Sequence, residues 1–137
     1  MDRAPLWYIE CVDIEGAALG VFPNEGGSGD WFHVRNEVAK GGAYHNDCCF
    51  YVRHALRKDG ALIIGCIESA AHRGVYVTLK SGADHELVDA MQAGHATPTA
   101  PTLQPGIAYT LRLPHGVSPE STRYRIVHAP ADAHAPA

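Results

Sequence analysis

The chain has 137 residues, of which 46% are hydrophobic and 19% are charged, and its formal net charge is −4. This length suits a single domain, residues 1–137, with a hydrophobic core of its own. The eleven Lys and Arg residues are scattered along the chain, so the sequence predicts neither a nucleic acid nor a membrane as a partner.

The N-terminal residues, MDRAPLWYIECVD, lack the positive start and apolar run of a signal peptide. No apolar stretch reaches the roughly 20 residues that a transmembrane helix needs, and we expect a cytoplasmic protein. Residues 6–22, LWYIECVDIEGAALGVF, predict two strands or a hairpin, which we interpret as an addition before the core of the fold.

Residues 30–39, DWFHVRNEVA, begin the predicted core of the fold. Phe32 and Val34 alternate with His33 and Arg35, which is the period of a strand with one buried face. We therefore predict a strand in the first half of this segment.

The segment CCFYVRHALRKDG, from residue 48 to residue 60, fits two structures. A strand would gather a mixed set of side chains on one face: Cys48, Phe50, Val52, His54 and Leu56. A helix would gather an apolar set within an arc of about 120°: Cys48, Cys49, Val52, Ala55 and Leu56.

The ends of this segment favour the helix. Asn46 and Asp47 are suitable N-caps, Arg57 and Lys58 would lie at the negative end of the helix dipole, and Gly60 is a typical helix stop. We predict a helix here, and the strand interpretation is the alternative.

Three further strands are predicted downstream. ALIIGCIES, residues 61–69, is apolar on both faces, as in a central strand. GVYVTLKS, residues 74–81, and GIAYTLRLP, residues 106–114, alternate between apolar and polar side chains.

A second helix is predicted over residues 81–94, SGADHELVDAMQAG. Leu87, Val88 and Met91 would share one face, and Gly94 would end the helix. Residues 122–129, TRYRIVHA, predict a closing edge strand, and residues 130–137 a tail.

The predicted order across residues 30–114 is β-α-β-β-α-β, the ferredoxin-like arrangement of an α+β fold. The alternative is an all-β fold, either a trefoil or a sandwich. It follows from the strand interpretation of residues 48–56.

Four stretches together resemble the dimeric α/β-barrel superfamily, namely FHVRNEV, RKDGALIIGCIE, GVYVTLKSGADHELVDAM and AYTLRLP. The muconolactone isomerase-like and YCII-like proteins have the most similar patterns. The resemblance implies a four-stranded sheet with helices on one face and a second copy on the other. It also implies a small, often aromatic or lactone-like substrate, handled by cofactor-free isomerases, cyclases, dehydrochlorinases or monooxygenases.

A homodimer has a physical reason too, because two short helices would cover only one side of a sheet whose strand 61–69 is apolar on both faces. The segments 6–22 and 122–129 are the rival cover for the exposed side.

His45 is the first candidate for acid–base catalysis. It lies beside Asp47 at the start of the predicted helix, with Tyr44 adjacent as a substrate-binding candidate. The YCII-like resemblance also implies a histidine on this helix. Histidine is the side chain that exchanges protons near neutral pH.

His33 and Glu37 are the other catalytic candidates, since muconolactone isomerase-like proteins keep ionisable pocket residues on this strand. Proton abstraction beside a carbonyl also needs a donor for the developing enolate. Tyr76 or Arg35 would serve as that donor, and Trp31 completes the substrate-binding set.

The four cysteines show no metal-ligand spacing: Cys11, Cys48, Cys49 and Cys66. The adjacent pair is too close in the chain to form a disulfide easily, so we expect buried free thiols. The sequence contains no P-loop, G-x-G-x-x-G, G-x-S-x-G or H-E-x-x-H motif, and we predict no metal and no cofactor.

The first functional hypothesis is a cofactor-independent isomerase, cyclase or lyase that uses His/Glu acid–base chemistry on a small unsaturated or aromatic metabolite. The second is a non-catalytic ligand-binding or assembly domain, since a fold does not choose its function. The third is a sugar-binding all-β module. A pocket that holds two or more candidates would favour the enzyme: His33, Glu37, His45 and Tyr76.

Overall fold

The computed structural model describes residues 5–23, 32–38, 46–80, 85–92, 103–112 and 122–129. Within these ranges the chain forms strands and one short 3-10 helix, η1, but no α-helix. The elements are β1 (Trp7–Cys11), β2 (Ala17–Pro23), β3 (Phe32–Val38), η1 (Asn46–Cys48), β4 (Phe50–Leu56), β5 (Leu62–Ser69), β6 (Val75–Lys80), β7 (His85–Gln92), β8 (Ala108–Arg112) and β9 (Thr122–His128).

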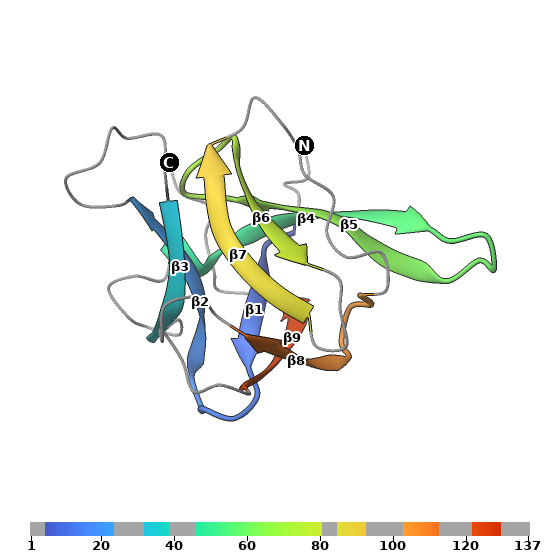
Figure 1. Ribbon diagram of the computed structural model, residues 1–137, viewed down its shortest axis with the longest axis horizontal. Helices are drawn as coiled ribbons and strands as arrows, with labels where there is room; N and C mark the ends of the chain where they lie inside the picture. The colour runs from blue at the N-terminus through green and yellow to red at the C-terminus, as the bar shows by residue number, and fades with distance from the viewer. Residues whose placement is uncertain are drawn as a thin grey trace.

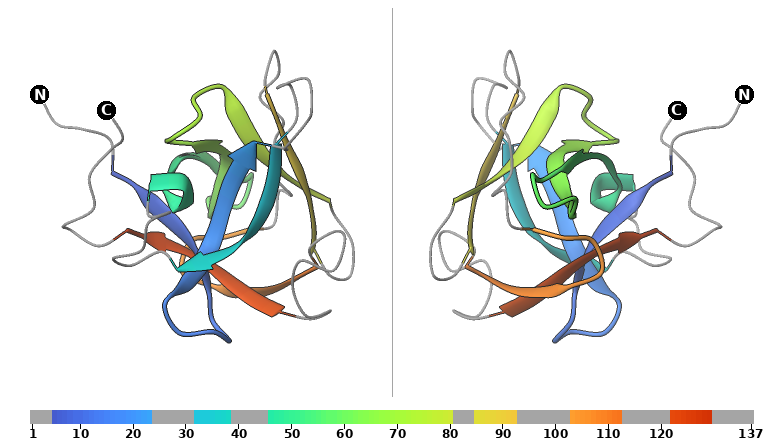
Figure 2. Two further views of the ribbon diagram at one scale, coloured as in Figure 1. Left: turned by 90° about the vertical axis from the view of Figure 1, so that its left-hand side faces the viewer. Right: turned by 90° about the vertical axis from the view of Figure 1, so that its right-hand side faces the viewer.

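The strands form one sheet in the order β3-β2-β1-β4-β5-β6-β7-β8-β9. All neighbours are antiparallel except β7 and β8, which are parallel. β1 also pairs with β9, from Trp7↔His128 to Cys11↔Tyr124, so the sheet curls into a half-barrel (Figure 1; Figure 2).

The ferredoxin-like prediction is wrong, and with it the assignment to the dimeric α/β-barrel superfamily. Both predicted helices are strands, so the β-α-β-β-α-β order is absent from the described residues. The fold is all-β, which is the class that the alternative interpretation gave.

The first predicted helix fails because its residues pair with distant parts of the chain. Asn46 and Asp47 begin only the short η1, and β4 then pairs with β5 along its length. Phe50, the one residue out of place on the helix, is fully buried and lies opposite Trp7 of β1. Burial of a phenylalanine stabilises a fold by about 3 kcal/mol, which exceeds the contribution of any helix cap.

The second predicted helix, residues 81–94, contains β7 instead. This strand pairs antiparallel with β6, where Leu87 lies opposite Leu79, and parallel with β8 at His85↔Leu111. It satisfies the backbone groups of two neighbours at once, so tertiary pairing overrides a local helical pattern. Gly94, the predicted stop, lies outside the described residues.

The terminal segments are central to the sheet. Residues 6–22 contain β1 and β2, and β1 contacts β2, β4 and β9. The strand predicted over 122–129 is β9, which pairs on both sides, with β8 and β1. Predicted strands 61–69, 74–81 and 106–114 correspond to β5, β6 and β8.

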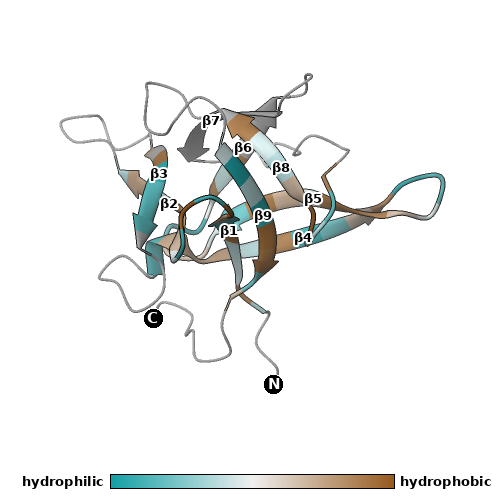
Figure 3. Ribbon diagram, turned by 90° about the horizontal axis from the view of Figure 1, so that it is seen from below, coloured by the Kyte–Doolittle hydropathy of each residue, from teal (hydrophilic) through white to brown (hydrophobic). Residues whose placement is uncertain are grey.

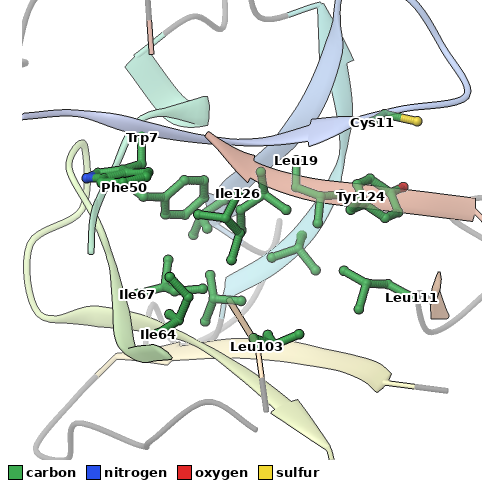
Figure 4. Packing of buried hydrophobic residues seen from close by; sticks show 14 of the residues in the cluster. Trp7, Cys11, Leu19, Phe50, Ile64, Ile67, Leu103, Leu111, Tyr124 and Ile126 are labelled. Carbon is green, nitrogen blue, oxygen red and sulfur yellow. The ribbon is translucent and has the colours of Figure 1, made fainter. Parts of the chain in front are cut away.

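Side chains from β1, β2, β4, β5, β8 and β9 converge on one hydrophobic core (Figure 4). Its members include Trp7, Leu19, Phe50, Ile64, Ile67, Leu103, Leu111, Tyr124 and Ile126. A second, smaller cluster lies on the opposite side of β1 and β2: Leu6, Tyr8, Ala18, Cys48, Cys49 and Ala70.

This second cluster shows that strands near β1 are buried on both faces within one chain. Three residues of β5 that do not belong to the main core are also buried: Cys66, Glu68 and Ser69. An apolar pattern on both faces of residues 61–69 therefore does not require a second copy, and the homodimer stays a prediction. No helix of the described residues is long and apolar enough to cross a bilayer.

Candidate functional site

The structure describes only part of the predicted site, in which His33 and Glu37 lie on the same strand, β3. Trp31, Tyr44 and His45 lie outside the described residues. His33 lies on β3, with its backbone opposite Phe22 of β2. Tyr76 lies on β6, which does not pair with β3.

Glu37 and Arg35 interact with each other on β3. The Arg35 Nε donates to Glu37 Oε1 at 2.9 Å, and the Arg35 guanidinium lies over the Phe22 ring at 3.9 Å. Both residues are half-buried. The carboxylate proposed as a base therefore binds the cation proposed as a substrate ligand.

A pocket lined by described residues lies in the hydrophobic core. Its walls are all apolar or aromatic: Ile9, Ile67, Leu103, Tyr109, Leu111, Tyr124 and Ile126. Its free space is hardly larger than one water molecule. The Tyr124 hydroxyl donates to Asn36 Oδ1 at 2.9 Å, and the Tyr109 hydroxyl accepts from Gln104 N at 2.9 Å. This pocket contains none of the predicted site residues.

The four cysteines are buried and free, as predicted. Burial raises the pKa of Cys48 to about 12, with smaller contributions from Cys49, Asp47 and Glu37. Burial, followed by Asp47, raises the pKa of Cys49 to about 11. Since only the thiolate is a nucleophile, neither thiol suits chemistry near neutral pH. The described residues contain no group of three or more side chains suited to a metal ion.

Asp47 and His72 form a contact that ties η1 to the turn between β5 and β6. The Asp47 Oδ1 lies 3.4 Å from His72 Nε2, and the His72 ring packs against Phe32 with centroids 5.2 Å apart. Each side chain is about one quarter exposed. This contact links three segments and has a structural role.

A row of polar and aromatic side chains crosses β4, β5 and β6 on the face away from the main core. Tyr51 pairs with Glu68, and Glu68 pairs with Tyr76. Residues that are directly opposite in antiparallel strands share a face, so these three side chains and the adjoining Arg73 form one surface. We call it the tyrosine row.

Glu68 is the buried centre of this row, only 6% exposed. Its Oε2 accepts from Arg73 Nε at 3.1 Å and from Gly74 N at 2.8 Å, while its Oε1 accepts from Arg73 Nη2 at 3.4 Å. Burial alone would raise the pKa of Glu68, but the bonds from Arg73 and Gly74 outweigh it, and the pKa is lowered. Gly74 has a φ of 89°, a left-handed conformation that suits glycine.

Arg73, the partner of the buried Glu68 carboxylate, is itself exposed to solvent. Its side chain is 64% exposed, and its guanidinium lies 4.6 Å from the centre of the Tyr51 ring. The carboxylate and the ring together fix the orientation of an exposed cation. Tyr51 and Tyr76 are half-buried, with part of each side chain open to solvent.

Beside the tyrosine row, residues 53–65 project from the sheet as a two-stranded hairpin, which we call the arm (Figure 1; Figure 3). Leu56 and Leu62 lie opposite each other near its tip and are 73% and 48% exposed. The turn is held by Arg57 and Asp59, which form an ion pair. Asp59 Oδ1 also accepts from Ala61 N at 3.0 Å.

Sequence reasoning missed Tyr51, Glu68 and Arg73 as a group because the helix interpretation of Tyr51 removes its strand pairing with Glu68. Reading residues 50–56 as a strand places Tyr51 on the face opposite Phe50, where it pairs with Glu68 of the predicted strand 61–69. The available signal was therefore the period-2 pattern of CCFYVRHAL. No family model, curated protein or solved structure matches the chain.

Proposed function

We propose that this protein is a non-catalytic binding module that docks on another protein through the arm and the adjoining tyrosine row. The observation that carries the proposal is the exposure of Leu56 and Leu62, opposite each other on a projecting hairpin. Neither leucine belongs to the core clusters of the described residues. Exposed apolar groups gathered on a projecting element and bordered by charged residues are typical of protein-binding surfaces.

The tyrosine row supports this proposal through its residue types. Tyrosine and arginine are enriched among the residues that contribute most to protein–protein binding. Arg73 is already held by Glu68 and Tyr51, so it would lose less conformational entropy on binding than a free side chain.

The enzyme hypothesis needs a pocket that holds two or more of its candidate residues. The core pocket described above holds none of them. A sugar-binding module is the second candidate, since the partly exposed rings of Tyr51 and Tyr76 flank an ionised carboxylate. Both oxygens of that carboxylate already accept hydrogen bonds from the chain, which favours the protein-binding proposal.

The proposal is tested by selecting peptides from a random display library on the wild-type protein. Selected peptides should lose binding to a Leu56→Ser/Leu62→Ser variant. They should still bind an Ile14→Ser variant. This is the control, since Ile14 lies in the β1–β2 turn and is 44% exposed, close to the 48% of Leu62. Peptides that bind all three proteins equally would contradict the proposal. Retention of sugars on a glycan array, abolished by Tyr76→Ala, would favour the sugar-binding module instead.

A further inference from the structure

The free edge of β4 is defined by the direction of its backbone groups. Arg57 N donates across the arm to Ala61 O at 3.0 Å, whereas Ile64 N donates away from β4, to Leu103 O at 2.9 Å. Hydrogen-bonded and non-hydrogen-bonded pairs alternate along an antiparallel ladder. The pairs His54↔Ile64 and Leu56↔Leu62 are therefore non-hydrogen-bonded, and the N–H and C=O groups of His54 and Leu56 point outward.

Little of this edge is covered by the described residues. β1 pairs with β4 only at Trp7↔Phe50, and no other described strand apart from β5 pairs with β4. The opposite side of the arm differs, since Leu103 bonds to β5 at Ile64. Residues 53–56 are all exposed. A strand edge with unpaired backbone groups is a template for a further strand.

The charge of the arm selects the partner. Residues 53–65 carry three Lys or Arg residues and one Asp, a formal charge of +2 in a chain of −4. Arg57 is paired with Asp59. Arg53 contributes a small part of the lowering of the Glu68 pKa, but neither Arg53 nor Lys58 forms an ion pair among the described residues. Two copies joined along this edge would bring their Arg53 side chains into one short ladder, where like charges repel. The charge therefore favours an acidic partner over a second copy.

The alternation of β4 sets the pattern of that partner. Arg53 and Ala55 lie on one face of the arm, and His54 and Leu56 on the other. A strand added to this edge would therefore place its acidic side chains beside Arg53. Its apolar side chains would lie beside Leu56, on the face that Leu56 shares with Leu62.

We propose that the β4 edge of the arm binds an extended segment of a partner protein in which acidic and apolar residues alternate. The segment adds as a further strand of the sheet, with main-chain bonds to His54 and Leu56 for affinity and Arg53 for charge selection. This inference rests on the proposed function and specifies its partner.

The test uses synthetic peptides and the full chain, with binding measured by fluorescence anisotropy. One peptide alternates Glu with Val or Leu, a second has the same composition with the acidic residues grouped, and a third replaces Glu with Lys. A fourth is the alternating peptide, N-methylated at every second residue so that its inward N–H groups are lost. We expect binding of the first peptide only. N-methylation should weaken it by more than about tenfold.

Protein variants locate the binding. Arg53→Glu should weaken the alternating peptide about fivefold to tenfold at low salt, and added salt should reduce the difference. Arg123→Glu makes the same change of charge on β9 and should leave binding unchanged. Circular dichroism and chemical denaturation establish that both variants are folded.

The outcomes separate this inference from the proposed function. If library peptides depend on Leu56 and Leu62 but bind equally well when N-methylated or basic, strand addition is overturned and the binding module stands. If no peptide depends on these leucines, both proposals fail. A dimer in light scattering that dissociates in Leu56→Pro, which lacks the outward N–H of residue 56, would show that a second copy occupies the edge, which also overturns the inference.

Discussion

One end of the β4–β5 pair lies in the hydrophobic core, and the other end lies at the protein surface. At the base, Phe50 and Ile67 are fully buried, whereas near the tip Leu56 and Leu62 are 73% and 48% exposed. The two strands remain paired throughout. Continuous strand pairing therefore does not by itself mean that both ends of a hairpin serve the stability of the fold.

A β-bulge marks the boundary between these two regions. The register shifts between Arg53 and His54, opposite Gly65, where an added Cβ would lie 3.1 Å from the Arg53 carbonyl oxygen. Bulges bend a strand and change the direction of its side chains. The arm thus leaves the curled sheet at the residue that we propose for charge selection.

Thiol reactivity should show the largest contrast between base and arm. The raised pKa values of Cys48 and Cys49, about 12 and about 11, leave little thiolate at pH 8. A cysteine introduced by Ala55→Cys would be exposed on the arm. We expect iodoacetamide to modify it at least about a hundredfold faster than the native pair, as measured by mass spectrometry of peptides over time. Comparable rates in the folded protein would show that the start of β4 is open to solvent.

The next contrast concerns stability. Phe50→Ala should lower the free energy of unfolding by about 3–5 kcal/mol, because it leaves a cavity beside Trp7 and Ile67. Urea denaturation followed by tryptophan fluorescence measures the loss. A loss below about 1 kcal/mol would mean that residue 50 is not a core position and would revive the helix interpretation, in which Phe50 is exposed.

The sequence predicted strands best where burial on one face is regular. The alternation of GVYVTLKS and GIAYTLRLP needs no knowledge of distant partners. The segment CCFYVRHAL differs, since its apolar residues fit both periods and its caps favour a helix. Its structure depends on Trp7, more than forty positions earlier in the chain, and local patterns do not contain that pairing. The tyrosine row was missed from the sequence for the same reason, because Tyr51 and Glu68 become neighbours only through strand register.

Glu68 connects the base to the tyrosine row, and its substitution should have an intermediate effect. Glu68→Gln breaks the ion pair with Arg73, and we expect a loss of about 1–2 kcal/mol in the free energy of unfolding at pH 7. The pKa of Glu68 is lowered in the folded state, so its contribution is present above the ordinary glutamate pKa. This contribution to stability is lost as the pH falls through the lower pKa that Glu68 has in the folded state.

The difference between Glu68→Gln and wild type should therefore narrow as the pH falls below about 4. Urea denaturation at a series of pH values measures it. A difference that stays constant from neutral to acid pH would assign the loss to packing and not to the charge. Arg73→Gln is the matched variant, since it removes the same pair from its exposed side.

The smallest effect on stability is expected at the tip of the arm. Leu56→Ser removes an exposed side chain and should change the free energy of unfolding by less than about 0.5 kcal/mol, while binding of library-selected peptides is lost. Urea denaturation and fluorescence anisotropy on the same preparation measure both quantities. Serine keeps the backbone N–H that points to the free edge, so the loss of binding is assigned to the apolar contact and not to a missing main-chain donor. A stability loss comparable to that of Phe50→Ala would show that the arm packs against the body of the protein. The division of the β4–β5 pair into a structural base and a binding tip would then be wrong.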